Sequence, residues 1–326
     1  MLPILSLLGW TLAFAVQSEK GNGSSLVWNK RKNTMLHWLR RRRGNSSVTT
    51  VTGNTLEHGS PYIVPATAGE ENRLDFQHQM LYRAIGKNYG APLTQPQKML
   101  DVGCGTGRWV VEMAIRFPQA NVVGIDITPV NVSQLIQPLN PPPENFTLLQ
   151  HDILTGLPFS ANWFDYVHQR FLSAALPEQH WPKVIDEIIR VTRPKGWIEL
   201  GEFGPPVARS GAAFVQLWNT WVALSATRGI DLNAGSKISE RLATSGLRNI
   251  TVQTVRFPIG DHGGRFGHAF SMDLLALGRA LRNGVIRQHI IAEGDYDMLY
   301  ARTQEELSNT SDGAFQPIFL AWGQKL

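Results

Sequence analysis

The segment at residues 99–109 constrains the fold more than any other part of the sequence. It reads MLDVGCGTGRW: an apolar run at 99–102 is followed by Gly103, Gly105 and Gly107, and then by a helical pattern of apolar residues. This order predicts a buried parallel strand, a tight glycine turn and a helix. Because the turn lacks side chains at three alternate positions, a nucleotide-like ligand can lie against the backbone amides at the start of the helix.

An acidic residue in the same segment narrows the class of ligand. Asp101 precedes the first glycine by two residues, and the spacing is GxGxG instead of the GxGxxG of dinucleotide-binding loops. A carboxylate at this place repels a pyrophosphate and attracts a cation. S-adenosylmethionine fits, since it carries a sulfonium, an ammonium and no phosphate. The segment resembles the cofactor motif of class I S-adenosylmethionine-dependent methyltransferases, which implies an α/β fold with a Rossmann-like, seven-stranded sheet and helices on both faces.

A second strand is expected at residues 121–126, and it ends in an acid. Asp126 follows Gly107 by 19 residues. A carboxylate at such a strand end can accept hydrogen bonds from both ribose hydroxyls of an adenosine. We therefore expect Asp126 to bind the ribose, with the neighbouring Ile127 also lining the cofactor site.

A third strand is expected at residues 146–150, and another acid follows it. In the methyltransferase pattern that the chain resembles, this acid accepts from the adenine amino group and its neighbour packs on the ring. The resemblance assigns these roles to Asp152 and Ile153. The alternative for Asp152 is to cap a local turn.

Residues 164–170 read FDYVHQR and resemble the fourth strand of the family, F-D-x-V-H-x-R. The resemblance places His168 where this fold faces the methyl group. As a catalytic base, His168 would deprotonate a hydroxyl or an amine of the acceptor. The alternative is a structural histidine held by hydrogen bonds. Glu202, at the end of the expected fifth strand, is a second polar candidate.

The rest of the chain continues the pattern. Gly196 is expected to supply the turn before the fifth strand. A helical face with Phe214, Trp218 and Trp221 belongs either to the core or to the wall of an acceptor pocket. The remaining elements are expected as a helix at 184–191, a strand at 250–257, helices at 268–289 and 296–307, and a last strand at 315–322. The resemblance implies that helical insertions form the acceptor pocket.

A helix is also expected from residue 68, ahead of the glycine loop. The sequence YxxP, starting at Tyr62, is followed by ExxRLDxQH at residues 70–78. Together they resemble the N-terminal signature of the fungal LaeA-like, or type 23, methyltransferases of secondary metabolism. The resemblance implies that the helix closes over the cofactor and places Tyr62, Gln77 or His78 near its methionine end. The alternative is that Gln77 and His78 cap internal hydrogen bonds.

Charge and composition predict a domain preceded by a tail. With 326 residues and 43% apolar content, the chain can bury a sizeable core, which we place at residues 60–326, after a tail and linker at 1–59. Residues 1–55 carry a net charge of +7 against +5 for the whole chain, so the basic excess belongs to the tail. We therefore expect no nucleic-acid surface on the folded body.

The tail begins with an apolar run at residues 2–16, which is shorter than a membrane-spanning helix requires. We expect a cytoplasmic protein that meets a membrane only if this run is a true anchor. In that case the arginines at 40–43 keep the catalytic domain in the cytosol. The single cysteine, Cys104, excludes a disulfide framework and fits a reducing compartment.

These patterns predict an S-adenosylmethionine-dependent methyltransferase. Its acceptor is expected to be an oxygen or nitrogen atom of a small-molecule intermediate of secondary metabolism, and no metal is expected. The alternative is a LaeA-like regulatory protein that keeps the cofactor fold and acts through protein partners. No pattern in the sequence indicates an oligomeric state.

Overall fold

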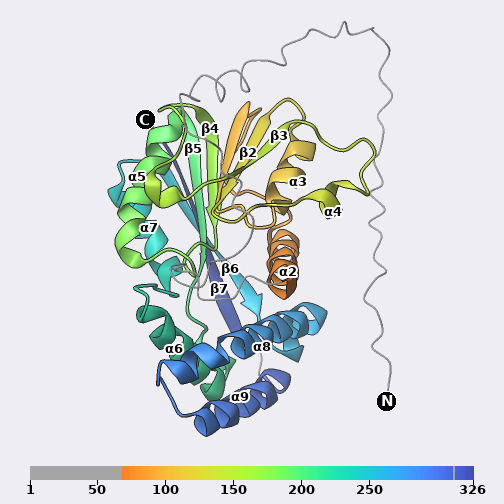
Figure 1. The fold of residues 1–326 in the computed structure, drawn as a ribbon, viewed down its shortest axis with the longest axis vertical. Coiled ribbons are helices and arrows are strands. Elements are labelled where there is room, and N and C mark those ends of the chain that lie inside the picture. Colours follow the sequence, from red (N-terminus) through yellow and green to blue (C-terminus); the bar gives the residue numbers. More distant parts are fainter. Residues whose placement is uncertain (1–67, 311–312) are drawn as a thin grey trace, which may run out of the picture. The chain divides into compact units, whose positions relative to one another are not determined.

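A computed structural model describes residues 68–310 and 313–326. The tail at 1–59, its apolar run at 2–16 and Tyr62 lie outside the described residues. A mixed sheet of seven strands, in the order β3-β2-β1-β4-β5-β7-β6, organises the fold (Figure 1). The strands are β1 (Lys98–Val102), β2 (Asn121–Asp126), β3 (Phe146–Gln150), β4 (Phe164–Arg170), β5 (Thr192–Phe203), β6 (Arg248–Pro258) and β7 (Phe315–Gln324).

The first five strands are parallel, whereas β7 runs antiparallel to both of its neighbours, β5 and β6. Parallel strands need both faces covered. Helices α3 (Arg108–Arg116) and α4 (Ser133–Ile136) cover one face, and α5 (Trp181–Val191) and α7 (Ile238–Thr244) cover the other (Figure 1). This is the predicted α/β architecture, and the expected strand–turn–helix order at the glycine loop is confirmed.

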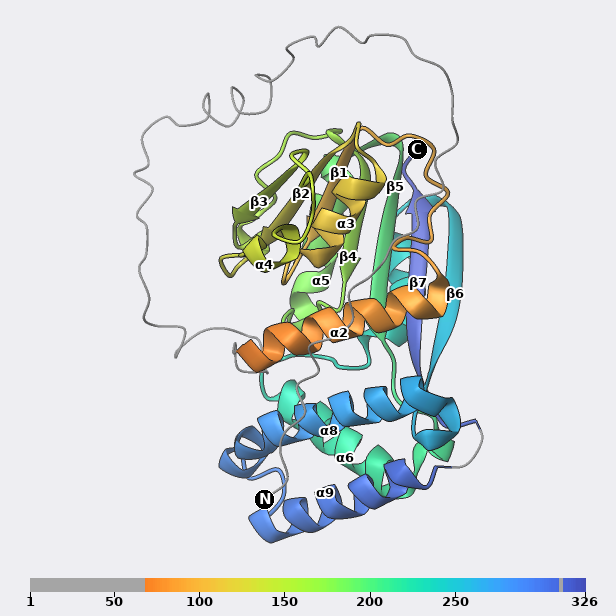
Figure 2. The same ribbon diagram turned by 90° about the vertical axis from the view of Figure 1, so that its right-hand side faces the viewer.

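Four longer helices lie beyond the carboxyl ends of the central strands. Helix α2 (Ala68–Ile85) lies between the sheet and a helical layer of α6 (Ala212–Ala226), α8 (Gly264–Arg287) and α9 (Glu293–Ser308), as Figure 2 shows. The expected N-terminal helix is thus confirmed. Helix α2 precedes β1 in the sequence, and its position brings it against α8, which follows β6.

The aromatic stripe of α6 packs inside the helical layer. Phe214 and Trp221 are fully buried and Trp218 is 5% exposed. The indole of Trp221 donates to the hydroxyl of Tyr296 in α9, 3.3 Å away. The stripe is therefore core, one of the two alternatives that the sequence left open, and its burial holds α6 to α9.

The bounds of several elements and one turn residue differ from the sequence-based expectation: α8 begins at Gly264 instead of residue 268, and α9 begins at Glu293 instead of residue 296. Helix α5 begins at Trp181 and not at residue 184, because Pro182 is accommodated in its first turn. The left-handed residue in this region is Lys195, with φ 64, and not Gly196, and β5 begins before it, at Thr192. Gly196 is required for close packing instead, since a Cβ there would lie 2.9 Å from the Arg193 carbonyl oxygen.

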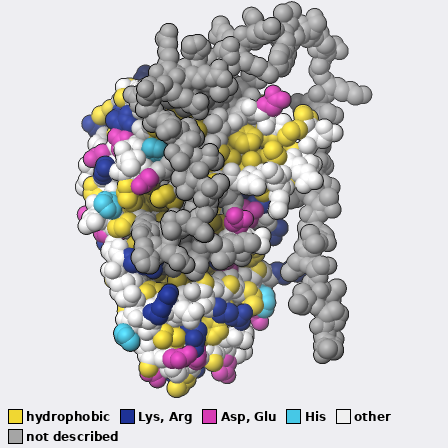
Figure 3. Space-filling model, viewed as in Figure 1, with side chains coloured by type: hydrophobic (Ala, Val, Ile, Leu, Met, Phe, Trp, Pro, Cys, Tyr) yellow, Lys and Arg dark blue, Asp and Glu magenta, His cyan; other side chains and the backbone are white. Residues whose placement is uncertain are grey.

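The described surface mixes charges of both signs. Figure 3 shows basic side chains interspersed with acidic ones over the part of this face that is described. Within residues 68–310 and 313–326, no helix combines the length and the apolar character needed to cross a membrane.

Candidate functional site

The glycine loop joins β1 to α3 and lies under α2. Gly105 has φ 54, which favours glycine, and a Cβ there would meet, among the described residues, only Leu74 of α2, at 3.7 Å. A Cβ at Gly107, by contrast, would lie 2.8 Å from Val132, so this glycine is needed for packing. The open position in the loop is therefore Gly105. Gly103 shares the left-handed conformation, with φ 71.

Asp126 ends β2 and closes the loop from the side. One carboxylate oxygen accepts from the amide of Gly105 at 2.8 Å, and the other accepts from the amide and hydroxyl of Thr128 at 3.0 and 2.8 Å. A carboxylate has about four lone-pair sites. Asp126 can therefore accept one further hydroxyl as it stands, and a second only if a present donor turns away.

The residues predicted for the adenine lie at the ends of β2 and β3. Asp152 accepts from the amide of Leu154 at 2.9 Å through Oδ1, so it caps a short 3₁₀ turn. Its Oδ2 makes no hydrogen bond within the described residues. Ile153 is partly buried and Ile127 is 49% exposed. The capping alternative holds for one oxygen of Asp152, and its role toward adenine stays a prediction.

Asp101 and His168 face each other from adjacent strands, where they are register partners. His168 Nδ1 lies 2.7 Å from Asp101 Oδ1, and both residues are buried. The imidazole also stacks on Trp109 of α3, with ring centroids 4.3 Å apart and planes within 1°. Contacts with Asp101 of β1 and Trp109 of α3 therefore support the structural alternative for His168 of β4. Its role as a base stays a prediction.

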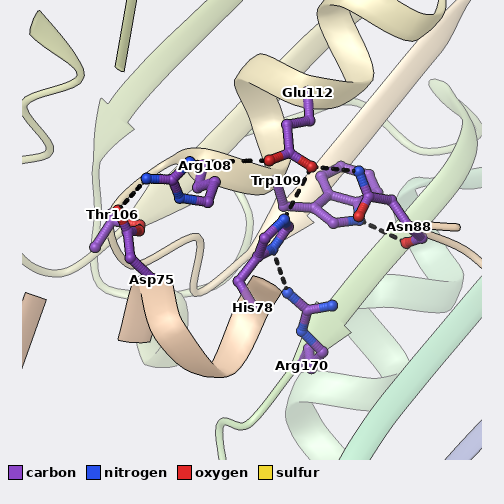
Figure 4. A network of polar contacts seen from close by, with 8 residues as sticks. All are labelled: Asp75, His78, Asn88, Thr106, Arg108, Trp109, Glu112 and Arg170. Carbon is purple, nitrogen blue, oxygen red and sulfur yellow. Dashed lines mark hydrogen bonds and ion pairs between the residues drawn. The ribbon is translucent and has the colours of Figure 1, made fainter. Parts of the chain in front are cut away.

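A polar network joins α2 to the glycine loop and α3 (Figure 4). Asp75 accepts from the Thr106 hydroxyl and from the Arg108 guanidinium, both at 2.5 Å. Thr106 directly follows Gly105, and Arg108 directly follows Gly107, at the start of α3. A charge-assisted contact of this kind fixes α2 over the loop.

His78 extends the network from α2 to α3 and β4 (Figure 4). Its Nδ1 accepts from Arg170 Nη2 at 2.8 Å, and its Nε2 lies 2.9 Å from a Glu112 oxygen that also accepts from Asn88. Accepting at Nδ1 requires a neutral ring that donates from Nε2. Burial, with Arg170 nearby, lowers the pKa of His78 and keeps it neutral.

The opposite side of α2 contacts the helical layer. Gln77 donates to Asp273 of α8 at 3.0 Å, and an Arg73 nitrogen lies 3.8 Å from the same carboxylate. Burial raises the pKa of Asp273 to about 6. The structure therefore separates two residues that the sequence placed together: His78 faces the glycine-loop side, and Gln77 faces α8.

A buried carboxylate fixes the turn after β4. Glu202 accepts from the Gln169 side chain at 2.6 Å and from the amides of Leu172 and Ser173 at 2.7 and 3.2 Å. Burial raises the pKa of Glu202.

Cys104, in the glycine loop, is also buried, and burial raises the pKa of its thiol. This agrees with an inert cysteine in the loop.

Several residues of this site were missed from the sequence. Arg170, Glu112 and Asp273 come from three elements: Glu112 lies in α3, five residues after Gly107, whereas Arg170 and Asp273 are far from the glycine loop in the sequence. Arg170 alone carried a signal, as the last residue of the F-D-x-V-H-x-R pattern.

Comparison with known proteins decides the family. A family model described as "Methyltransferase domain" matches residues 99–196, from β1 to the start of β5. Methyltransferase str3 of Strobilurus tenacellus is 31% identical over 206 residues, which cover 61% of this chain and 71% of the relative. The chain belongs to the S-adenosylmethionine-dependent methyltransferases. The cofactor of this methyltransferase is accordingly S-adenosylmethionine.

Two further similarities cover a smaller part of the chain or involve a protein of lower sequence identity. The secondary metabolism regulator laeA of Coprinopsis cinerea is 31% identical over 150 residues, which cover 44% of the methyltransferase and 35% of the relative. A phosphoethanolamine N-methyltransferase of Haemonchus contortus, solved with S-adenosylhomocysteine, is 19% identical with a TM-score of 0.45. That alignment covers 82% of this chain and 55% of the other.

Proposed function

We propose that this methyltransferase transfers a methyl group to an oxygen or nitrogen atom of a small-molecule intermediate of fungal secondary metabolism. The observation that carries the proposal is the position of α2 over the glycine loop, with Leu74 facing Gly105 and Asp75 bound to Thr106 and Arg108. A helix over the cofactor loop excludes water and helps to align a displacement reaction. The relative str3 supports methyl transfer as the activity.

The residues present fit the cofactor. The open loop position at Gly105 leaves room against the backbone, and the buried carboxylate of Asp101 suits a cationic ligand. Asp126 would bind the ribose, and Asp152 the adenine amino group, with Ile127 and Ile153 against the ring. When bound, S-adenosylmethionine supplies an electrophilic methyl group on its sulfonium.

We assign His168 to orienting Asp101, on the strength of their 2.7 Å contact and the stacking on Trp109. His168→Ala should then weaken cofactor binding several-fold as well as slow turnover. A catalytic base would behave differently: its loss would slow turnover, change the pH dependence of kcat and leave cofactor affinity unchanged. Calorimetry with S-adenosylhomocysteine, alongside kcat measured across pH, separates the two roles.

The acceptor class is tested by labelling. The purified protein is incubated with S-adenosylmethionine labelled in the methyl group and with extracts of a fungal strain that lacks its gene. A labelled metabolite, absent when Gly105→Val protein is used, supports the proposal. The similarity to laeA makes regulation through protein partners the second candidate. Label on no small molecule, together with a co-purifying protein partner, would favour that candidate and refute the first.

A further inference from the structure

Arg170 is a positive charge that has no carboxylate at contact distance in the part of the chain that the structure describes. It is the last residue of β4, and within the described residues no carboxylate oxygen lies within 4.0 Å of its guanidinium. Its one hydrogen bond among these residues runs from Nη2 to the neutral His78 (Figure 4). Burial lowers the pKa of Arg170. A desolvated guanidinium in this state is costly unless an anion joins it.

The acids around Arg170 already have donors of their own. Glu112 is held by His78 and Asn88, and Asp101 by His168. Glu199, the third acid in the vicinity, accepts from two backbone amides and from the Tyr166 hydroxyl. These carboxylates attract Arg170 only at longer range. None of these described acids therefore completes the coordination of Arg170, which leaves its remaining nitrogens available to an anion from a ligand.

The neighbourhood defines which anion fits. Asp101 on β1 is the register partner of His168 on β4, and Arg170 follows two residues later on the same face of the sheet. A buried carboxylate and a partly buried guanidinium on adjacent strands match the ammonium and carboxylate of an α-amino acid. S-adenosylmethionine carries this group at its methionine end.

We propose that Arg170 binds the α-carboxylate of S-adenosylmethionine and that His78, from α2, orients the guanidinium for this contact. The proposal rests on the proposed function, because it takes the glycine loop as the cofactor site. Arg170 would present its remaining nitrogens to two carboxylate oxygens, the geometry that guanidinium groups favour. The helix over the loop thereby takes part in cofactor recognition through His78.

The test compares ligands with and without the carboxylate, by calorimetry on the full chain. The probes are S-adenosylmethionine, decarboxylated S-adenosylmethionine and 5′-methylthioadenosine. The unmodified protein should bind S-adenosylmethionine at least about tenfold more tightly than its decarboxylated form, because a charge-assisted pair is lost. Equal affinity for the two would overturn the assignment without any variant.

The variant Arg170→Gln should lose about 10- to 100-fold in affinity for S-adenosylmethionine and change little for the decarboxylated ligand. Arg170→Lys, which keeps the charge, should fall between the two. Arg193→Gln is the matched control, because Arg193 is 54% exposed and pairs with Asp165 instead. An equal loss for both ligands would mean that Arg170 only supports the fold, and unchanged binding would mean that it takes no part.

A failure of the proposed function looks different from a failure of this inference. A protein that binds none of the three probes refutes the cofactor site, and with it the role of Arg170. A protein that binds 5′-methylthioadenosine and S-adenosylmethionine with equal affinity keeps the nucleoside site and refutes the carboxylate contact.

Discussion

At the scale of residues, the candidate site is dominated by polar groups that are already engaged. Asp126 holds the glycine loop through Gly105 and its own turn through Thr128. His78 holds Arg170 on one ring nitrogen and Glu112 on the other. Such preorganised groups lose little freedom when a ligand arrives, so each should contribute measurably to binding.

Replacing Asp126 should weaken cofactor binding. Asp126→Ala removes a charged acceptor for the ribose and the hydrogen bond that fixes Gly105, so we expect a loss of about 2–3 kcal/mol in affinity for S-adenosylmethionine. Isothermal calorimetry measures this loss. Asp186→Ala, on the exposed side of α5, is the control. Unchanged affinity in Asp126→Ala would show that the ribose does not bind at the end of β2.

The protonation of His78 should give cofactor affinity a pH dependence. The pKa of His78 is lowered from its ordinary 6.5, so the ring is neutral at neutral pH and accepts from Arg170. Protonation at acidic pH places a proton on Nδ1 and removes that contact. Affinity for S-adenosylmethionine should therefore be flat above pH 6.5 and fall at lower pH.

Affinity for S-adenosylmethionine measured across the same pH range in His78→Gln serves as the comparison, since the glutamine side chain does not titrate. An acid-side fall in affinity of equal size in both proteins would contradict the role of His78.

At the scale of elements, α2 is held on two sides. One side contacts the glycine loop and α3 through Asp75 and His78, and the other contacts α8 through Gln77. The second contact includes Asp273, whose carboxyl group is buried. The nearest guanidinium nitrogen of Arg73 lies 3.8 Å from this carboxyl group, which is long for an ion pair. The junction of α2 with α8 therefore contains an ionisable group whose charge is poorly compensated.

The variant Asp273→Asn should stabilise the fold at neutral pH. The folded-state pKa of about 6 lies above the ordinary 3.8, so the folded protein favours the protonated acid. Its contribution to stability is present below pH 3.8 and is lost as the pH rises toward 6. Asparagine keeps an acceptor for Gln77 without the charge, and we expect the free energy of unfolding at pH 8 to increase by about 1–3 kcal/mol.

Urea denaturation at pH 5 and pH 8 measures this difference, with Asp186→Asn as the exposed control. The gain should be smaller at pH 5, where Asp273 is already largely protonated. A loss of stability at pH 8 would show that the ionised carboxylate is stabilised by Arg73 more than it is destabilised by burial.

At the scale of the whole molecule, we propose that residues 60–326 form the methyltransferase domain and that 1–59 are dispensable for cofactor binding. The family match begins at residue 99, well after this segment. Removal of residues 1–55 should leave thermal unfolding and S-adenosylmethionine affinity unchanged within error. Calorimetry on the truncated and full chains provides the comparison, and loss of folded protein on truncation would refute the proposal.

Local sequence patterns were sufficient to predict the central sheet. Buried parallel strands read as apolar runs, and their ends carry the acids and glycines that turn the chain, so the bounds of β2 and β3 agree with the expected 121–126 and 146–150. The left-handed turn before the central part of β5 was assigned to the wrong residue, because the close packing that requires Gly196 comes from Arg193 and Asp165. Only the folded structure brings these neighbours together.

The sequence by itself determined the fold class, the cofactor loop and the acids at the strand ends, because each depends on residues close together in the chain. Tertiary structure decided which side each α2 residue faces, and it paired His168 with Asp101 and Arg170 with His78. It also buried Phe214 and Trp221 in the helical layer. These contacts join elements up to 196 residues apart, as between Gln77 and Asp273, and no local periodicity records such a distance.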